Sequence, residues 1–322
     1  MDHIVLSKTG LKASRLCFGT MTFGGQTDEP TSVQMVERCL DAGINFFDTA
    51  NAYTGGASET MLGRALKGRR NRVLLASKVS NKVGDAPDQK GLSRPAIRRA
   101  IDETLQRLET DYLDLYYMHL PDYSTSIEES LAAMDELVKE GKVRHVAQSN
   151  YAAWQIVEMQ WICSDKKYQP VVVSQPMYNL LARGIEQELL PMSKAFSIAN
   201  VVYNPLAGGL LTGKHNVAEP IVGSRFDKNK MYLDRYWHQD DFSAVEAVRQ
   251  IAEKAGRSMV SLALCWLLHH TPIECVILGA SKLEQLDQNL AAAEEGPLDA
   301  ETLAALDEVW QRLRGVTPKY NR

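Results

Sequence analysis

Short apolar runs alternate with longer amphipathic stretches along most of the chain. Eight runs rich in Val, Ile, Leu and Phe recur at Arg15 to Gly19, Asn45 to Asp48, Val73 to Lys78, Leu113 to His119, Val143 to Ser149, Val171 to Gln175, Val201 to Asn204, and Cys275 to Gly279. Near-continuous apolar character is typical of strands that are covered on both faces, as in a parallel sheet wrapped by helices. The pattern therefore predicts eight parallel strands.

The stretches between these runs carry helix signals. Ser126 and Glu129 have the spacing of a capping box at the start of an apolar-periodic segment. Thr31 is predicted to begin a helix that ends at Gly43, and Ser93 to begin another. Eight strands that alternate with helices favour a closed (β/α)8 TIM barrel, and an open doubly wound sheet is the structural alternative.

Three segments depart from this alternation. Residues 3–14, HIVLSKTGLKAS, read as an N-terminal β-hairpin that closes the barrel floor. Residues 206–241 form a long connection rich in glycine and aromatic residues, and connections of this length are usually functional or mobile. Thr302 to Leu313 predict an extra C-terminal helix. We expect one barrel domain over residues 1–322.

Composition narrows the class of partner. The formal charge of −4 and the pI near 6.0 give no basic footprint for nucleic acid. The five cysteines are odd in number and lie mostly in apolar runs, which is typical of thiols in a reducing compartment. No apolar run approaches the roughly 18 residues of a membrane span, and the N-terminus lacks a signal-peptide pattern. We expect a cytoplasmic protein without a nucleic-acid or membrane partner.

Four polar residues, Asp48, Tyr53, Lys78 and His119, lie at or just beyond the ends of three consecutive predicted strands. The C-terminal ends of barrel strands meet at one mouth, where barrel enzymes hold their catalytic groups. A phenol with a pKa near 10 acts as an acid near neutral pH when a cation favours its phenolate, and Lys78 is the candidate cation. Asp48 would keep Lys78 charged, and His119 would bind the same substrate oxygen as Tyr53.

Each of the four residues alone is more often structural, as an ion pair, a packed ring or a satisfied histidine. Their joint placement at one mouth favours a catalytic site. A lyase or isomerase with a Schiff base on Lys78 is an alternative. A metal site has no support, because neither H-E-x-x-H nor C-x-x-C occurs.

The chain resembles the aldo-keto reductases in stretches from one end of the barrel to the other. These stretches are FFDTANAY, LASKV, YYMHL, QSN, SQPMYN, YNPLAGGLLTGK and ILGASKLEQLDQNL. The resemblance implies a (β/α)8 fold and the NADPH-dependent reduction of an aldehyde or ketone, which is reversible as alcohol oxidation. It also implies that Tyr53 is the general acid, that Lys78 lowers its pKa, that Asp48 pairs with Lys78, and that His119 orients the carbonyl.

The same resemblance implies a cofactor site on the later strands. Ser149, Asn150 and Gln175 would bind the nicotinamide carboxamide, and Tyr203 would stack on its ring. The other cofactor-binding candidates are Asn204, Leu206, Gly208, Lys214, Arg225, Gly279, Ser281, Lys282, Gln285 and Asn289. No G-x-G-x-x-G occurs, so a Rossmann loop would not hold the dinucleotide.

Two segments suit the phosphates of that cofactor. Leu206 to Lys214 offers small residues and backbone donors to a pyrophosphate, and a helix that starts near Lys282 would favour an anion at its N-terminus. We assign Ser281 and Lys282 to the adenosine 2′-phosphate. Gln285 stands where many aldo-keto reductases have an arginine, which weakens discrimination against NADH; NADPH remains the expected cofactor.

The substrate is a small carbonyl compound that the sequence does not identify. Phe23, Tyr123, Trp237 and Tyr320 are candidates for an aromatic wall beside Tyr53 and His119. A cofactor-binding regulatory subunit with little turnover is the second function that the resemblance allows. The outer helix faces leave a homo-oligomer open.

Overall fold

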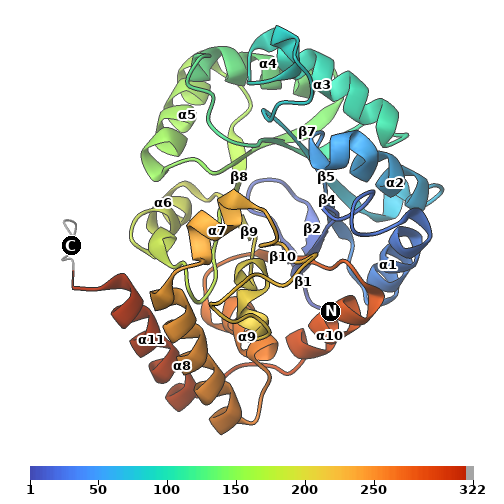
Figure 1. The fold of residues 1–322 in the computed structure, drawn as a ribbon. Helices are drawn as coiled ribbons and strands as arrows, with labels where there is room; N and C mark the ends of the chain where they lie inside the picture. Colours follow the sequence, from blue (N-terminus) through green and yellow to red (C-terminus); the bar gives the residue numbers. More distant parts are fainter. Residues whose placement is uncertain (317–322) are drawn as a thin grey trace.

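Eight parallel strands close into one barrel in the computed structural model, which describes residues 1–316 (Figure 1). The order around the barrel is β10-β3-β4-β5-β6-β7-β8-β9. The strands are β3 (Leu16–Gly19), β4 (Phe46–Asp48), β5 (Leu74–Val79), β6 (Leu113–Met118), β7 (Val143–Ser149), β8 (Val171–Gln175), β9 (Ala199–Val202) and β10 (Cys275–Gly279). The predicted (β/α)8 TIM barrel is confirmed.

Helices surround this barrel, and most of them cover the outer faces of its strands (Figure 1). The helices of the described residues are α1 (Glu29–Asp41), α2 (Ala57–Ala65), α3 (Arg94–Arg107), α4 (Ile127–Lys139), α5 (Ala153–Lys166), α6 (Leu189–Phe196), α7 (Lys230–Tyr236), α8 (Gln239–Ala255), α9 (Met259–His270), α10 (Leu283–Ala293) and α11 (Ala300–Arg314). The predicted C-terminal helix is α11, which packs against α8. None of the helices in residues 1–316 is long and apolar enough to span a membrane.

The structure differs from the prediction at the start of one helix and in one capping contact of another. The helix assigned to Thr31 begins earlier, because the side chain of Asp28 accepts the backbone N–H of Thr31 and caps α1. Ser126 caps α4 as predicted, by accepting the N–H of Glu129. The carboxylate of Glu129 instead accepts the backbone N–H of Arg94, so it joins α4 to the start of α3.

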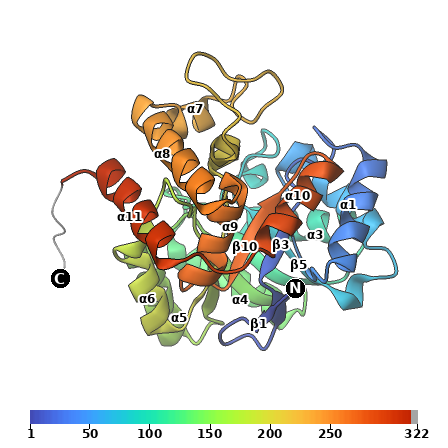
Figure 2. The same cartoon turned by 90° about the horizontal axis from the view of Figure 1, so that it is seen from below.

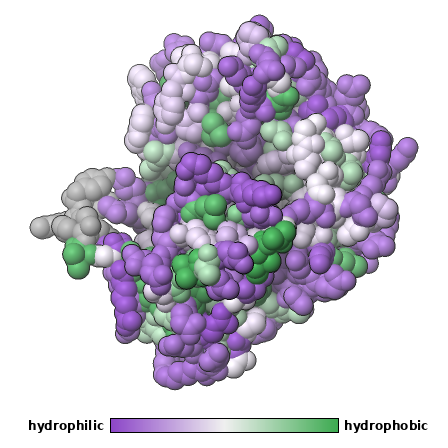
Figure 3. Space-filling view, viewed as in Figure 1, coloured by the Kyte–Doolittle hydropathy of each residue, from purple (hydrophilic) through white to green (hydrophobic). Residues whose placement is uncertain are grey.

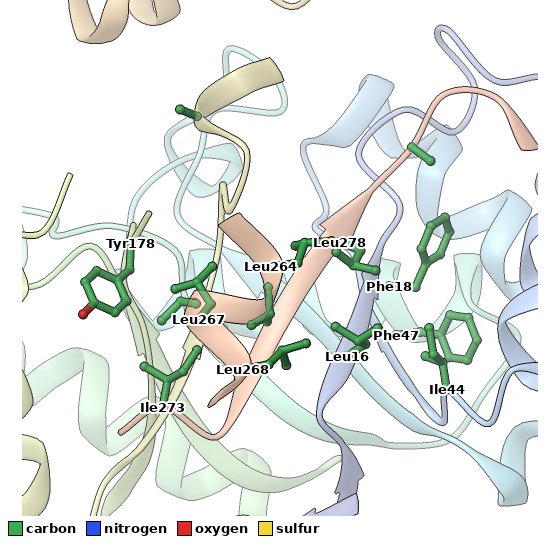
Figure 4. Close-up of a cluster of buried hydrophobic side chains, with 14 of the residues drawn as sticks. Leu16, Phe18, Ile44, Phe47, Tyr178, Leu264, Leu267, Leu268, Ile273 and Leu278 are labelled. Atoms are coloured by element: carbon green, nitrogen blue, oxygen red, sulfur yellow. The ribbon is translucent and has the colours of Figure 1, made fainter. Parts of the chain in front are cut away.

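The core has an inner and an outer layer. Inside the barrel, side chains such as Cys17, Phe46 and Leu115 pack together. Between the strands and the helices a larger cluster includes Leu264 of α9 and Phe18 of β3, part of which is drawn in Figure 4. Both layers follow from strands that bury alternate side chains on opposite faces.

The N-terminal hairpin closes one end of the barrel. Strands β1 (His3–Val5) and β2 (Lys12–Ser14) pair antiparallel, as predicted. Leu6 and Leu11 of the hairpin pack with the inner barrel cluster. Figure 2 shows β1 at one end of the molecule and α7 at the other. The barrel therefore has a closed floor and a mouth on the side of α7.

The long connection, residues 206–241, is more ordered than its composition indicated. It contains the turn η5 (Ala207–Thr212), the helix α7 and the start of α8. The strand before it was also placed too late in the sequence, because β9 runs over Ala199–Val202. Asn200 enters this strand since its N–H donates to Glu274 at 2.6 Å and its side chain accepts the Ser193 hydroxyl at 3.1 Å.

Candidate active site

A buried ion pair joins the ends of β4 and β5 at the mouth. The ammonium of Lys78 donates to Asp48 Oδ1 and, at 2.8 Å, to the carbonyl oxygen of Thr49. Gln175 of β8 donates to Asp48 Oδ2 at 2.9 Å from across the barrel. Burial opposes the charge on Lys78, but Asp48 and Tyr53 hold its pKa above the ordinary value. Lys78 is therefore a cation at neutral pH.

Tyr53 reaches this pair from the loop after β4. Its hydroxyl lies 3.3 Å from Lys78 Nζ. The loop turns sharply, with Thr54 at φ +47° and Gly55 at φ +64°, and the Thr54 hydroxyl donates to the carbonyl of Phe23 at 2.6 Å. Burial raises the pKa of Tyr53, while Lys78 opposes that rise. The net direction is the reverse of the lowered pKa that we expected, so the phenol is protonated at neutral pH.

His119 stands beside Tyr53 at the end of β6. The two ring centroids are 5.9 Å apart, with the rings nearly perpendicular. Burial and the charge of Lys78 lower the pKa of His119 to about 3, so the imidazole is neutral. Asp48, Tyr53, Lys78 and His119, hereafter the tetrad, thus meet at the mouth as the sequence predicted.

Asn81 is a residue of this site that the sequence analysis missed. Its Nδ2 lies 2.9 Å from His119 Nδ1. An amide nitrogen donates and does not accept, so Nδ1 accepts this bond and the neutral ring carries its proton on Nε2. The only sign of it in the sequence was a polar residue in the loop after Lys78. The spacing did not indicate that this residue contacts His119.

The residues assigned to the nicotinamide lie together beside the tetrad. Asn150 donates to the carbonyl of His119 at 2.9 Å and accepts the hydroxyl of Tyr203 at 2.7 Å. Ser149 donates to the carbonyl of Gln175 at 2.8 Å. These bonds connect the ends of β6, β7, β8 and β9 into one polar rim next to the Asp48–Lys78 pair.

The cofactor-binding candidates in the long connection differ in their surroundings. Asn204 accepts the N–H of Gly208 at 2.6 Å and donates to the hydroxyl of Tyr236 at 2.9 Å, so its side chain holds the turn itself. The carbonyl of Leu206 accepts N–H groups of the same turn. Arg225 extends toward β10, where Nη2 lies 4.0 Å from the position that a Cβ on Gly279 would occupy. The Arg225 guanidinium therefore lies next to the backbone of Gly279.

A side chain from the first turn of α10 occupies the hydrogen-bond donors at the start of this helix. Gln285 accepts the backbone N–H of Ser281 at 2.9 Å and its hydroxyl at 3.1 Å. Asn289 donates to the carbonyl of Gly279 at 3.4 Å. Lys282, the residue before the helix, is exposed. A phosphate at this position would meet Lys282 directly and would replace Gln285 at the N–H of Ser281.

Comparison with known proteins decides the family. A model of the aldo/keto reductase family matches residues 15–311. The chain belongs to the aldo/keto reductase family. It is 37% identical to human aldo-keto reductase family 7 member A3 over 94% of this chain and 96% of that protein. By reaction class it is an oxidoreductase.

Other relatives within the family differ in their names. Human aflatoxin B1 aldehyde reductase member 2 is 37% identical over 94% of this chain and 88% of that protein. A probable voltage-gated potassium channel subunit beta of Arabidopsis thaliana is 35% identical over 92% of this chain and 93% of that protein. Membership of the aldo/keto reductase family therefore includes proteins named as reductases and proteins named as channel subunits.

The aromatic residues expected to line the substrate pocket are scattered. Phe23 has no exposed surface and packs on Phe18 in the core, so it does not line an open pocket. Tyr123 is 87% exposed in the loop after β6. Trp237 packs between Phe226 and Phe242 in the long connection. Tyr320 lies outside the described residues.

The mouth face is mainly hydrophilic, with small hydrophobic areas (Figure 3). Within residues 1–316 no group of three or more His, Cys, Asp or Glu side chains is arranged to hold a metal ion. Charged groups of the site include the Asp48–Lys78 pair, Arg225 beside Gly279, and Lys282 just before α10.

Proposed function

We propose that this protein reduces the carbonyl group of an aldehyde or ketone with NADPH, and oxidises the alcohol in the reverse direction. The observation that carries the proposal is the contact of Tyr53 with buried Lys78 at 3.3 Å beside a neutral His119. This cluster brings a phenol proton, a cation and an imidazole N–H together at the barrel mouth. Such a set can give a proton to a substrate oxygen and stabilise the charge that remains.

Each residue of the tetrad has one role in this proposal. Tyr53 transfers its hydroxyl proton to the carbonyl oxygen as that oxygen gains negative charge. Lys78, paired with Asp48, stabilises the phenolate that is left behind. His119 donates Nε2–H to the same oxygen and orients the carbonyl, because Asn81 occupies Nδ1. The raised pKa of Tyr53 keeps its hydroxyl protonated at neutral pH.

The residues around the mouth fit a dinucleotide phosphate. Lys214, Arg225 and Lys282 supply cations from two segments, and Gly279 leaves room for a close approach beside Arg225. Ser149, Asn150 and Gln175 offer amide and hydroxyl groups next to the tetrad. When bound, NADPH would supply the hydride. NADH is a weaker candidate, because Lys282 suits the additional phosphate of NADPH.

The replacement Tyr53→Phe tests the proposal most directly. It should lower kcat for 4-nitrobenzaldehyde or methylglyoxal on the order of 10²–10⁴-fold, since a positioned general acid contributes about that much. The measurement is the loss of NADPH absorbance. Tyr168→Phe, on the outside of the barrel, is the matched control and should retain the wild-type rate. Retained turnover in Tyr53→Phe together with unchanged NADP+ affinity would sink the assignment of the acid.

A regulatory subunit is the second candidate, favoured by the relatives named as channel subunits. It would bind NADP+ tightly and turn over none of a panel of aldehydes and ketones. The same wild-type preparation separates the two functions, because fluorescence titration reports binding and absorbance reports turnover. Binding without turnover would replace the enzyme proposal by the regulatory one.

A further inference from the structure

His215, in the long connection, is a buried titratable residue that the tetrad does not use. Its exposed fraction is 7%. Its ring packs edge-on against Phe226 and Trp237, with centroids 5.1 and 5.7 Å apart. Neither Nδ1 nor Nε2 has a hydrogen-bond partner among the described residues. Most buried polar side chains are hydrogen-bonded, so two unpartnered nitrogens on one ring call for an explanation.

The ring nitrogen Nε2 faces the glycine turn that precedes it. A Cβ added to Gly209 would lie 3.8 Å from His215 Nε2 and 3.9 Å from Lys214 Cε. Gly209 has φ +105°, a backbone conformation that side chains disfavour. The backbone of Gly209, the stem of Lys214 and an unpaired imidazole nitrogen therefore lie close together.

Two cationic side chains lie close to His215 in the structure. Lys214 precedes it in the chain, and Arg249 of α8, which also pairs with Glu246, donates to the carbonyl of Gly213 at 2.6 Å. Asp240 and Asp241 lie in the first turn of α8 next to Phe242, and neither is hydrogen-bonded to His215. Burial first, and then Lys214, lower the pKa of His215 to about 4, so the ring is neutral without a ligand.

We propose that His215 binds the diphosphate of the dinucleotide together with Lys214 and takes up a proton when that anion binds. This inference rests on the proposed function, because it needs the phosphate-bearing cofactor. Nε2–H donates to a phosphoryl oxygen, and the nearby negative charge favours the imidazolium. The added proton comes from the solvent and stays on the ring, and no bond of the cofactor changes.

The sign of the pH effect follows from linkage. A group whose pKa is higher in the complex than in the free protein binds a proton along with the ligand. Affinity for NADP+ should therefore increase as the pH falls from 7.5 to 5.5, as reported by a decreasing Kd. The 2′-phosphate of NADP+ also titrates near pH 6, so the informative quantity is the difference between wild-type and variant proteins.

The test is isothermal titration calorimetry of NADP+ in buffers of different ionisation enthalpy, which counts the protons taken up on binding. His215→Phe keeps the aromatic packing and removes both nitrogens. At pH 6 it should bind NADP+ about tenfold more weakly than wild type and take up fewer protons, since a hydrogen bond to a charged group is lost. His215→Gln should bind more tightly than His215→Phe at pH 7.5, but with the reduced proton uptake of that variant.

Thermal unfolding without ligand controls for the fold. His215→Phe should unfold no earlier than wild type, because it removes unpartnered polar atoms from an aromatic cluster. Equal Kd and equal proton uptake in all three proteins across this pH range would overturn the role of His215. Failure of the wild-type protein to bind NADP+ at all would instead overturn the proposed function, so the two failures are distinguishable.

Discussion

The tetrad and the long connection differ in how well their buried polar groups are hydrogen-bonded. In the tetrad, Asp48 receives bonds from Lys78 and Gln175 on two other strands. In the long connection, His215 has no hydrogen-bond partner within residues 1–316, and Asp241 is a buried carboxylate whose pKa is raised to about 6 by burial. Strand ends thus fix the Asp48–Lys78 pair that Tyr53 contacts, whereas the connection contains groups left in an unfavourable state.

This difference indicates that the tetrad is preorganised, whereas the long connection can adapt to a ligand. A barrel strand is held on both sides by neighbouring strands, so its last residue keeps one position. A connection held mainly by aromatic packing, as around Phe226 and Trp237, can change its polar contacts at lower cost. The chemistry would then belong to the rigid part of the mouth, and ligand capture to the adaptable part.

The largest expected contrast is in stability. Asp48→Asn should lower the free energy of unfolding by about 3–5 kcal/mol, because it leaves buried Lys78 without its counter-charge. Asp241→Asn is the matched substitution in the long connection. It should leave stability at pH 7 unchanged or slightly raised, since it removes a carboxylate that burial penalises. Urea unfolding at pH 7 measures both, and similar losses would contradict the contrast.

The dependence of stability on pH should also differ in sign. The pKa of His119 is about 3 when folded and about 6.5 when unfolded. Its contribution to stability is therefore complete above pH 6.5 and is lost as the pH falls toward 3. Asp241, with its folded pKa raised to about 6, contributes the reverse slope below pH 6.

Urea titrations between pH 6.5 and 4.5 separate these two slopes. His119→Gln should lose less stability on acidification than wild type, by up to about 1.4 kcal/mol per pH unit. Asp241→Asn should lose more than wild type over the same range. Parallel pH curves for the three proteins would show that neither group is perturbed as described.

The smallest expected effect tests how the imidazole is oriented. Asn81→Leu should lower kcat/KM by about three- to tenfold, since it removes one hydrogen bond to His119 Nδ1. Asn81→Asp should lower it further, because a carboxylate needs a proton on Nδ1 and would draw it from Nε2. Steady-state rates across pH 6 to 8 measure both. A rate for Asn81→Asp above that of Asn81→Leu would refute the assigned tautomer.

Much of the fold could be predicted from the sequence because barrel strands are apolar on both faces. The bounds of β7, β8 and β10 agree with the predicted runs. The strand at Ala199–Val202 was shifted because Asn200 reads as a loop residue, and its partner Glu274 lies far along the chain. The seven-residue helix α7 was missed for a related reason, since so short a helix depends on tertiary packing.

The tetrad was predictable from the sequence for a geometric reason, namely that parallel strand ends coincide in space. Asn81 and His215 were not. Asn81 acts through a bond between two loops, and the unpaired state of His215 is visible only once its neighbours are placed. Burial also decided the direction of the Tyr53 pKa shift, which the neighbouring lysine alone had indicated wrongly.

The N-terminal hairpin completes the floor of a barrel whose interior is already filled by side chains. Leu6 and Leu11 of the hairpin pack into that inner cluster, so the mouth is the open end of the barrel. Two ligands that meet at the tetrad would therefore both enter and leave on the side of the mouth. The short hairpin at the far end of the molecule would in this way leave the mouth as the single face for ligand exchange.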